Sequence, residues 1–127
     1  MPLVRINLPQ TTTQADVTAI SHAVHGALVA TFNVPEPDRF QAIHRHVPQE
    51  LVCTPEFLGV KHSQQVVFVQ ISCSPGRSLD MKKALYAKIA ADIARTSSFK
   101  LEDVIINLLE TSRENWSFGL GVAQYAL

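Results

Sequence analysis

The sequence predicts an α+β fold built from two β-α-β units in tandem, within one domain that covers residues 1-127. Three observations support this prediction. Short segments carry alternating or continuous apolar residues, which is typical of strands. Two longer segments have apolar residues three and four positions apart, as amphipathic helices do. The length of 127 residues fits one domain, because domains commonly contain roughly 100–200 residues.

The first unit opens with a strand over Pro2 to Leu8, because apolar and other side chains alternate there. Three threonines, Thr11 to Thr13, offer hydroxyls for the start of a helix, and Asp16 suits its first turn. A helix of roughly five turns is then predicted from the apolar residues at helical spacing, which are Val17, Ile20, Val24, Leu28 and Phe32.

This helix is expected to stop at Asn33, because two prolines follow within the segment from Pro35 to Asp38. Phe40 to Val47 is predicted to form a short strand that completes the first unit. Pro48 to Gly59 is predicted to be a loop.

The second unit begins with Gln65 to Ser72, where a nearly continuous apolar run predicts a strand in the centre of the sheet that is buried on both faces. A turn and then a helix follow, with Ser78 as N-cap, Asp80 in the first turn and an end near Arg95. Val104 to Leu109 is predicted as the last strand. Each helix is long enough to connect two parallel strands within its own unit.

The composition narrows the classes of function. Lys and Arg together number 11, as do Asp and Glu, and this balance argues against a nucleic-acid partner. No apolar run of about 18 residues is present, so no membrane span is expected. The start of the chain does not resemble a signal peptide, and a cytoplasmic location is expected. Cys53 and Cys73 are expected to be reduced and buried.

The histidines do not form a motif of known metal spacing. His22 and His25 lie three apart on the first predicted helix, and His44 and His46 lie two apart on a predicted strand. No acidic or cysteine partner recurs at a suitable spacing, so solvent-exposed histidines are expected, with neither a metal nor another cofactor.

Pro2 is the residue whose possible chemistry is the most unusual in this sequence. Methionine aminopeptidase normally removes Met1 before a small residue such as proline, which would leave a secondary amine at the head of a strand. An α-amino group has a pKa of about 8, and burial lowers it, so the amine could exchange protons near neutral pH. Two alternatives stay open: a Met-Pro start has no function in many proteins, and retained Met1 leaves Pro2 as a non-basic amide.

Further motifs follow Pro2 in order. They are Val34-Pro35-Glu36-Pro37-Asp38-Arg39-Phe40-Gln41, Ser74-Pro75-Gly76-Arg77-Ser78 with Lys82-Lys83-Ala84-Leu85-Tyr86, Asn107, and Trp116-Ser117-Phe118-Gly119. Together they resemble the tautomerase superfamily, in the long-chain branch that includes malonate semialdehyde decarboxylases. The resemblance covers essentially the whole chain. It implies a four-stranded sheet with two helices on one face, assembled as a homotrimer.

The resemblance also implies residue roles. Pro2 corresponds to the catalytic amino-terminal proline, Asp38 to an aspartate that assists it, and Arg77 to the basic residue that holds the substrate carboxylate. Arg77 also precedes a predicted helix N-terminus, where a guanidinium and free amides favour an anion. The proposed substrate-binding set is Arg77, Ser74, Asn107, Trp116 and Phe118. Trp116 and Phe118 would form an apolar wall or simply pack in the core or between subunits. Asn107 would bind a carbonyl or be a polar group in a buried strand that needs a partner.

The resemblance implies keto–enol tautomerisation of small 2-keto acids, with Pro2 as general base and no cofactor. One group of the decarboxylases has two arginines in the loop that holds Arg77, whereas this chain has one there. Decarboxylation or hydration by a cationic Pro2 is the alternative within the same site. A non-catalytic trimer that binds a ligand, with Pro2 blocked by Met1, is the alternative from another class.

Overall fold

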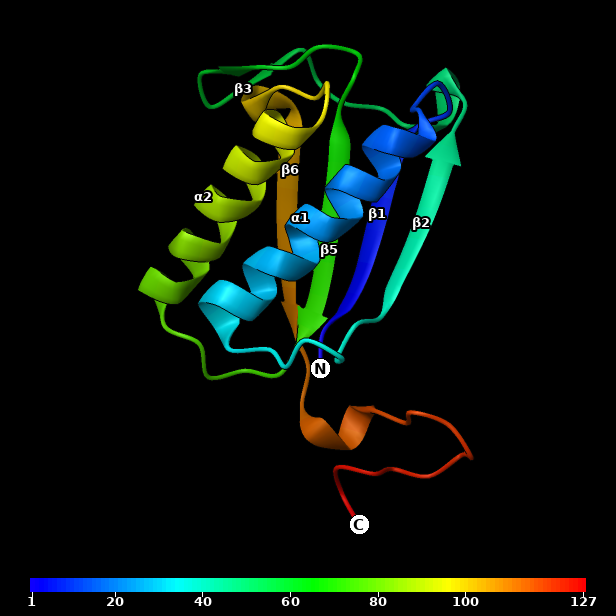
Figure 1. Ribbon diagram of the computed structural model, residues 1–127, viewed down its shortest axis with the longest axis vertical. Coiled ribbons are helices and arrows are strands. Elements are labelled where there is room, and N and C mark those ends of the chain that lie inside the picture. Colours follow the sequence, from blue (N-terminus) through cyan, green and yellow to red (C-terminus); the bar gives the residue numbers. More distant parts are fainter.

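The computed structural model describes residues 1–127 as a four-stranded mixed sheet with two helices on one face (Figure 1). The sheet order is β2-β1-β5-β6. These strands span Gln41–His46, Leu3–Pro9, Val67–Cys73 and Val104–Glu110 respectively. β1 and β2 are parallel, β5 and β6 are parallel, and the two central strands β1 and β5 run antiparallel. The tandem β-α-β prediction is therefore confirmed.

The helices are α1 (Gln14–Phe32) and α2 (Leu79–Thr96), and each begins at a predicted hydroxyl cap. The side chains of Thr13 and Ser78 each accept a backbone N–H from the first turn at 3.2 Å. Asn33 ends α1 in the left-handed region, with φ 57°. Neither helix is long and apolar enough to cross a membrane.

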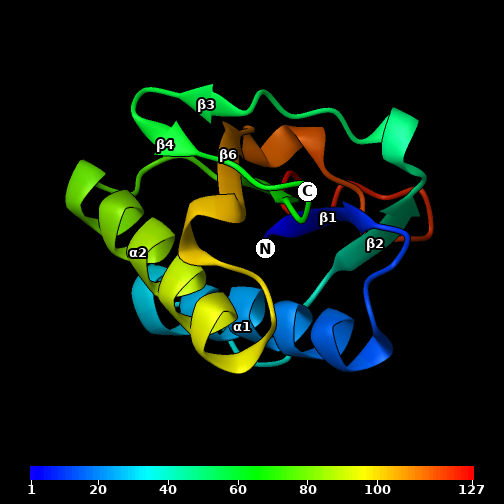
Figure 2. The ribbon, with the colours of Figure 1, turned by 90° about the horizontal axis from the view of Figure 1, so that it is seen from above.

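Both helices lie on the same side of the sheet, as Figure 2 shows from above. The hydrophobic core lies between the helices and the sheet face that they cover. Alternate side chains of β1 and β5 point into this core. The buried set from these two strands is Val4, Ile6, Leu8, Val67, Val69, Ile71 and Cys73. β5 lies in the sheet centre as predicted, but its other face is only half-buried within one chain. The prediction of burial on both faces is therefore wrong for the single chain.

The segment predicted as a loop from Pro48 to Gly59 contains regular structure. A short 3₁₀ helix, η1, spans Pro48–Glu50, and a two-stranded hairpin follows with β3 (Glu56–Phe57) and β4 (Val60–Lys61). The two connecting residues, Leu58 and Gly59, both have positive φ, at 49° and 82°. Such a two-residue connection is the geometry that matches the right-handed twist of antiparallel strands. Non-glycine residues rarely adopt a positive φ, so the sequence around Leu58 does not indicate a hairpin turn.

Two further 3₁₀ turns flank the last strand. η2 (Leu101–Asp103) leads into β6, and η3 (Arg113–Asn115) follows it. Asp103 is buried and accepts two hydrogen bonds from Ser63, from the backbone N–H at 2.8 Å and from the hydroxyl at 2.5 Å. This carboxylate thereby fastens the segment after the hairpin to the start of β6.

Candidate active site

The start of β1, the turn before β2 and the loop after β5 lie at one end of the molecule, near the N label in Figure 1. These segments contain Pro2, Asp38, Ser74 and Arg77. β1 and β2 are parallel, so the residues that precede each of them lie at the same edge. β5 runs antiparallel to β1, so the loop that follows β5 reaches this edge as well. Residues far apart in the sequence therefore lie at the same end of the sheet because of which strands pair and in which direction.

The chain start is buried at this edge and is paired with Asp38. Pro2 is buried, and the Met1 ammonium nitrogen lies 2.5 Å from Asp38 Oδ2. The Asp38 side chain is only 19% exposed, and that of Met1 is 5% exposed. Consecutive Cα atoms are about 3.8 Å apart. The carboxylate that contacts Met1 therefore lies close to Pro2, the next residue along the chain.

Asp38 belongs to a tight turn between α1 and β2. Its backbone N–H donates to the Pro35 carbonyl at 2.9 Å, and the Arg39 N–H donates to Pro37 at 3.0 Å. The Phe40 carbonyl accepts from Val4 N–H at 2.9 Å, which joins the end of this turn to β1. The carboxylate is thus presented by a hydrogen-bonded turn rather than by a loose loop.

Arg77 is fixed by its own chain and keeps donors for a ligand. Its Nη1 donates to the Ser74 carbonyl at 3.1 Å and its Nη2 to the Phe32 carbonyl at 3.3 Å. The guanidinium carbon also lies 5.0 Å from the centre of the Phe32 ring. Gly76, with φ 115°, allows the sharp turn in the chain between Ser74 and Arg77. A guanidinium has five N–H groups, so these two bonds hold it in place and leave three for an anion.

Cys73 is a neighbour of the chain start that the sequence did not reveal as one. Leu3 pairs with Ser72, and one more step along the strands places Cys73 beside Pro2. Burial raises the pKa of the Cys73 thiol, while the positive charge of Arg77 opposes that rise in part. The thiol is therefore protonated at neutral pH, and the Cys73 side chain packs in the hydrophobic core.

The aromatic side chains of the C-terminal segment pack beside the Asp38 turn. Trp116 stacks on Phe118 with 5.4 Å between ring centres, and Phe118 lies 5.7 Å from Phe40, two residues after Asp38. Tyr125 meets the edge of this group, 5.2 Å from Phe118. The indole Nε1 of Trp116 is buried without a hydrogen-bond partner. The segment thus places an apolar surface with one unpaired donor close to the turn.

Asn107 lies apart from these groups. It is exposed on the sheet face that the helices do not cover, and its Oδ1 accepts from Gln70 Nε2 at 3.1 Å. The β5–β6 register places it three positions before Glu110, which pairs with Cys73. The expectation of a buried strand around Asn107 is wrong for the single chain, because β6 is an edge strand with one face covered. Its role in binding a carbonyl stays a prediction.

Of the four histidines on the first predicted helix and the strand after it, His25 and His46 are not fully exposed. His25 is buried, and its Nε2 donates to the Glu36 carbonyl at 2.7 Å, so the expectation of an exposed His25 is wrong. His46 is half-buried, with its Nε2 2.8 Å from Asn7 Oδ1. Each of these two rings has a hydrogen-bond partner within the chain, as buried polar groups usually do. His22 and His44 are exposed as expected.

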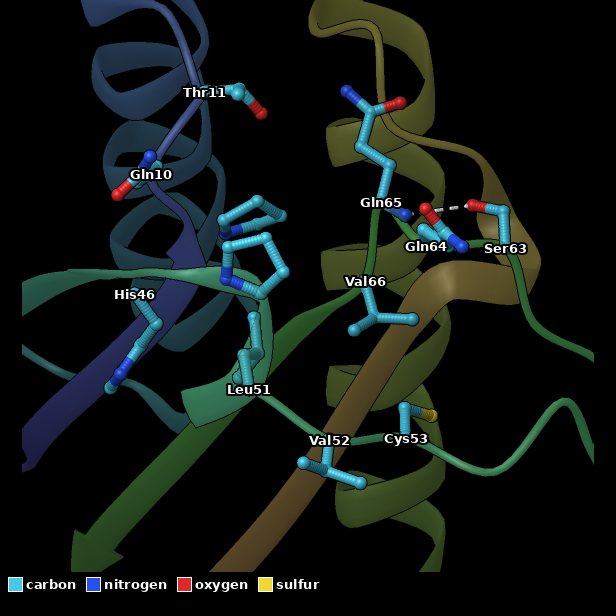
Figure 3. A pocket seen from close by; sticks show the side chains of 12 residues that line it. Gln10, Thr11, His46, Leu51, Val52, Cys53, Ser63, Gln64, Gln65 and Val66 are labelled. Carbon is cyan, nitrogen blue, oxygen red and sulfur yellow. Dashed lines mark hydrogen bonds between the residues drawn. The ribbon is translucent and has the colours of Figure 1, made fainter.

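A cavity of about 590 Å³ lies at the opposite end of the sheet, where β1 ends. Figure 3 shows the side chains that line it. It is lined by the end of β1, by His46 and by the segments around Val52 and Gln65. None of the predicted site residues lines it. The cavity is therefore separate from the edge that holds Pro2.

Comparisons with known proteins agree on one family. Two family models, both described as "Tautomerase enzyme", match residues 38–119 and 2–61. The probable tautomerase YusQ of Bacillus subtilis (strain 168) is 33% identical, with 98% of each chain covered. The chain belongs to the tautomerase family. The resemblance seen in the sequence is confirmed, and the assignment supports a tautomerase-type enzyme.

Solved structures extend this agreement to the fold. FG41 malonate semialdehyde decarboxylase, solved as inhibited by 3-bromopropiolate, is 34% identical with a TM-score of 0.90, covering 97% of this chain and 93% of that one. A fused 4-OT, solved as a symmetric trimer, is 18% identical with a TM-score of 0.78, covering 98% of each chain. At that lower identity the likeness to fused 4-OT shows the shared fold alone.

Proposed function

We propose that this tautomerase-family protein catalyses keto–enol tautomerisation of small 2-keto acids, with Pro2 as general base once Met1 is removed. The observation that supports this most is the meeting of Pro2, Asp38 and the Arg77 loop at one sheet edge. Pro2 is buried there, and burial favours the neutral form of an amine. The neutral amine removes a proton from the carbon beside the carbonyl, and the protonated amine then gives that proton to the carbonyl oxygen, which yields the enol and restores the neutral amine.

Arg77 is proposed to bind the substrate carboxylate. Its guanidinium is already held by two backbone carbonyls and by Phe32, so little side-chain freedom is lost when an anion binds. The N-terminus of α2 follows directly, where unpaired amides favour negative charge. Ser74 lies in the same loop, and Trp116 and Phe118 supply the apolar wall on the side of Asp38.

A second candidate is decarboxylation of a malonate-semialdehyde-type acid, and one contact favours it specifically. A carboxylate close to an amine favours the protonated amine, and Asp38 Oδ2, which lies 2.5 Å from the Met1 nitrogen, would adjoin the Pro2 amine once Met1 is removed. A cationic Pro2 would act as an acid: the bond to the carboxyl carbon breaks, CO₂ leaves, and the amine protonates the carbon left behind. The 34% identity to a malonate semialdehyde decarboxylase supports the same reaction.

We also propose that the protein is a homotrimer. The sheet face opposite the helices carries the half-buried side of β5, and a second chain would complete its burial. The fused 4-OT that shares this fold is a symmetric trimer. The alternative function for the same trimer is non-catalytic: Met1 is retained, and the protein binds a ligand without catalysing a reaction.

The test uses untagged protein whose intact mass shows that Met1 is absent. Ketonisation of phenylpyruvate enol is followed by ultraviolet absorbance, and CO₂ release from malonate semialdehyde is measured in parallel, with Pro2→Ala beside wild type. Tautomerase activity that Pro2→Ala abolishes supports the first candidate. CO₂ release that Pro2→Ala abolishes, without tautomerase activity, supports the second. Absence of both activities would refute the catalytic proposals and leave the binding protein.

A further inference from the structure

His25 is a buried polar side chain to which the proposed chemistry assigns no part. It lies on the core side of α1 and is only 3% exposed. Its Nε2 donates to the backbone carbonyl of Glu36 at 2.7 Å. The Glu36 carboxylate is 3.8 Å from the same nitrogen, but that side chain is largely exposed. The main hydrogen bond of the His25 ring is therefore the one to the Glu36 backbone carbonyl, not a contact with the Glu36 carboxylate.

The segment that His25 holds has few backbone donors of its own. Pro35 and Pro37 lack an N–H, so neither can fasten the segment through its amide. Before Glu36, the Val34 N–H reaches the Leu28 carbonyl only at 3.4 Å. After it, Asp38 closes a turn with Pro35, a contact that shapes the turn without joining it to the rest of the molecule. The end of the turn is joined to β1 by the bond from Val4 N–H to the Phe40 carbonyl, and the His25 side chain supplies the donor that joins its start to α1.

A second attachment lies beyond Asp38 and is exposed to solvent. The Arg39 guanidinium donates to Ser21 Oγ at 2.8 Å, and it approaches His22 Nδ1 at 3.4 Å. Exposed polar contacts of this kind contribute little to holding a segment, because water competes for both partners. The bond from His25 is made two residues from Asp38, and its donor side chain is only 3% exposed.

We propose that His25 is a positioning residue that acts through Asp38. It anchors the Glu36 carbonyl to α1 and thereby holds the Asp38 carboxylate against the amino terminus. This inference rests on the proposed function, because it gives Asp38 a part in proton transfer at Pro2. His25 itself touches neither the amine nor the substrate.

The experiment compares His25→Leu, which removes the donor, with His25→Gln, whose side-chain amide can still donate to the carbonyl. His62→Leu is the matched control, because His62 Nδ1 also bonds a loop carbonyl, that of Thr54 at 2.9 Å, but in the hairpin region. Steady-state kcat and KM are measured with phenylpyruvate enol and malonate semialdehyde. Amide hydrogen exchange is measured at Asp38 and Arg39. Thermal unfolding verifies that each variant is folded.

In His25→Leu we expect kcat to fall about tenfold with KM changed less than about twofold, since the loss of one buried hydrogen bond corresponds to roughly that factor. Exchange at the Asp38 and Arg39 amides becomes faster. His25→Gln restores both readouts toward wild type, and His62→Leu changes neither. Wild-type kcat and wild-type exchange in folded His25→Leu would overturn the proposal, as would equal losses in the Leu and Gln variants.

Asp38→Asn separates this inference from the proposed function. If His25 acts through Asp38, the double variant is no slower than Asp38→Asn alone. Losses that simply multiply would show that His25 acts by another route and would overturn the proposal. If Asp38→Asn retains full activity, the part given to Asp38 in the proposed function is wrong. Exchange at the Asp38 amide then tests the anchor by itself, with faster exchange in His25→Leu supporting it and unchanged exchange refuting it.

Discussion

Replacing Thr111 by valine is expected to raise the free energy of unfolding by about 1 kcal/mol. Thr111 follows β6, and its backbone N–H donates to the Cys73 carbonyl at 2.8 Å. Its Oγ1 is buried and has no hydrogen-bond partner. A buried hydroxyl without a partner costs about 1–3 kcal/mol of desolvation, and valine has nearly the same shape without that group. The backbone bond to Cys73 is kept, so only the hydroxyl is tested.

Thr12→Val is the matched control, because Thr12 is also buried but its Oγ1 donates to the Pro9 carbonyl at 2.6 Å. That variant is expected to lose about 1 kcal/mol, the net value of one such bond. Urea denaturation at one fixed protein concentration measures both. With an m-value of about 2 kcal/mol/M, each change moves the midpoint by about 0.5 M, in opposite directions. A loss in Thr111→Val as large as that in Thr12→Val would refute the reasoning, since it would show that the Thr111 hydroxyl is bonded in solution.

Three other substitutions test the core, the site and the surface. Ile89→Ala is expected to lower the free energy of unfolding by about 2–5 kcal/mol, because Ile89 is fully buried in the core; a loss below about 1 kcal/mol by urea denaturation would contradict this packing. Arg77→Lys is expected to stay folded but to lower kcat/KM at least about tenfold, because an ammonium cannot reproduce the held, forked donor; unchanged steady-state kinetics would remove Arg77 from the proposed carboxylate site. The hydrogen bond from Lys88 holds the pKa of Asp92 below its usual range, so Asp92 adds stability above its unfolded pKa that is lost as pH falls through the folded pKa. Asp92→Asn is therefore expected to have a lower denaturation midpoint than wild type near neutral pH and to converge with it in acid, and equal midpoints at neutral pH would argue against the ion pair.

The secondary structure was largely predictable because its signals are local. Helical spacing and hydroxyl caps at Thr13 and Ser78 located both helices, and Asn33 marked the end of α1. The β3–β4 hairpin was not predicted, since its turn uses Leu58 in a left-handed conformation that leaves no clear pattern in the sequence. A long residue in such a turn depends on its surroundings more than on its own preference.

The candidate site was predictable in part. Pro2, Asp38 and Arg77 were identified by a family resemblance, and the structure shows that strand direction brings them to one edge. The burial of His25 could not be predicted. Helical spacing places a histidine on one face of a helix, but it does not indicate that a loop carbonyl, here that of Glu36, lies within hydrogen-bond distance. The exposed position of Asn107 was missed because an apolar strand can be an edge strand whose second face stays uncovered in one chain.

The sequence by itself therefore determined the order, type and approximate limits of the main helices and strands, together with the family to which they belong. Those properties depend on residues within a few positions of one another, so periodicity and capping are enough to set them. Only the tertiary structure decided that Asp38 pairs with the chain start, that Arg77 is held by the Phe32 carbonyl and that Cys73 adjoins Pro2. These contacts join segments tens of residues apart, and they depend on which strands pair and in which direction.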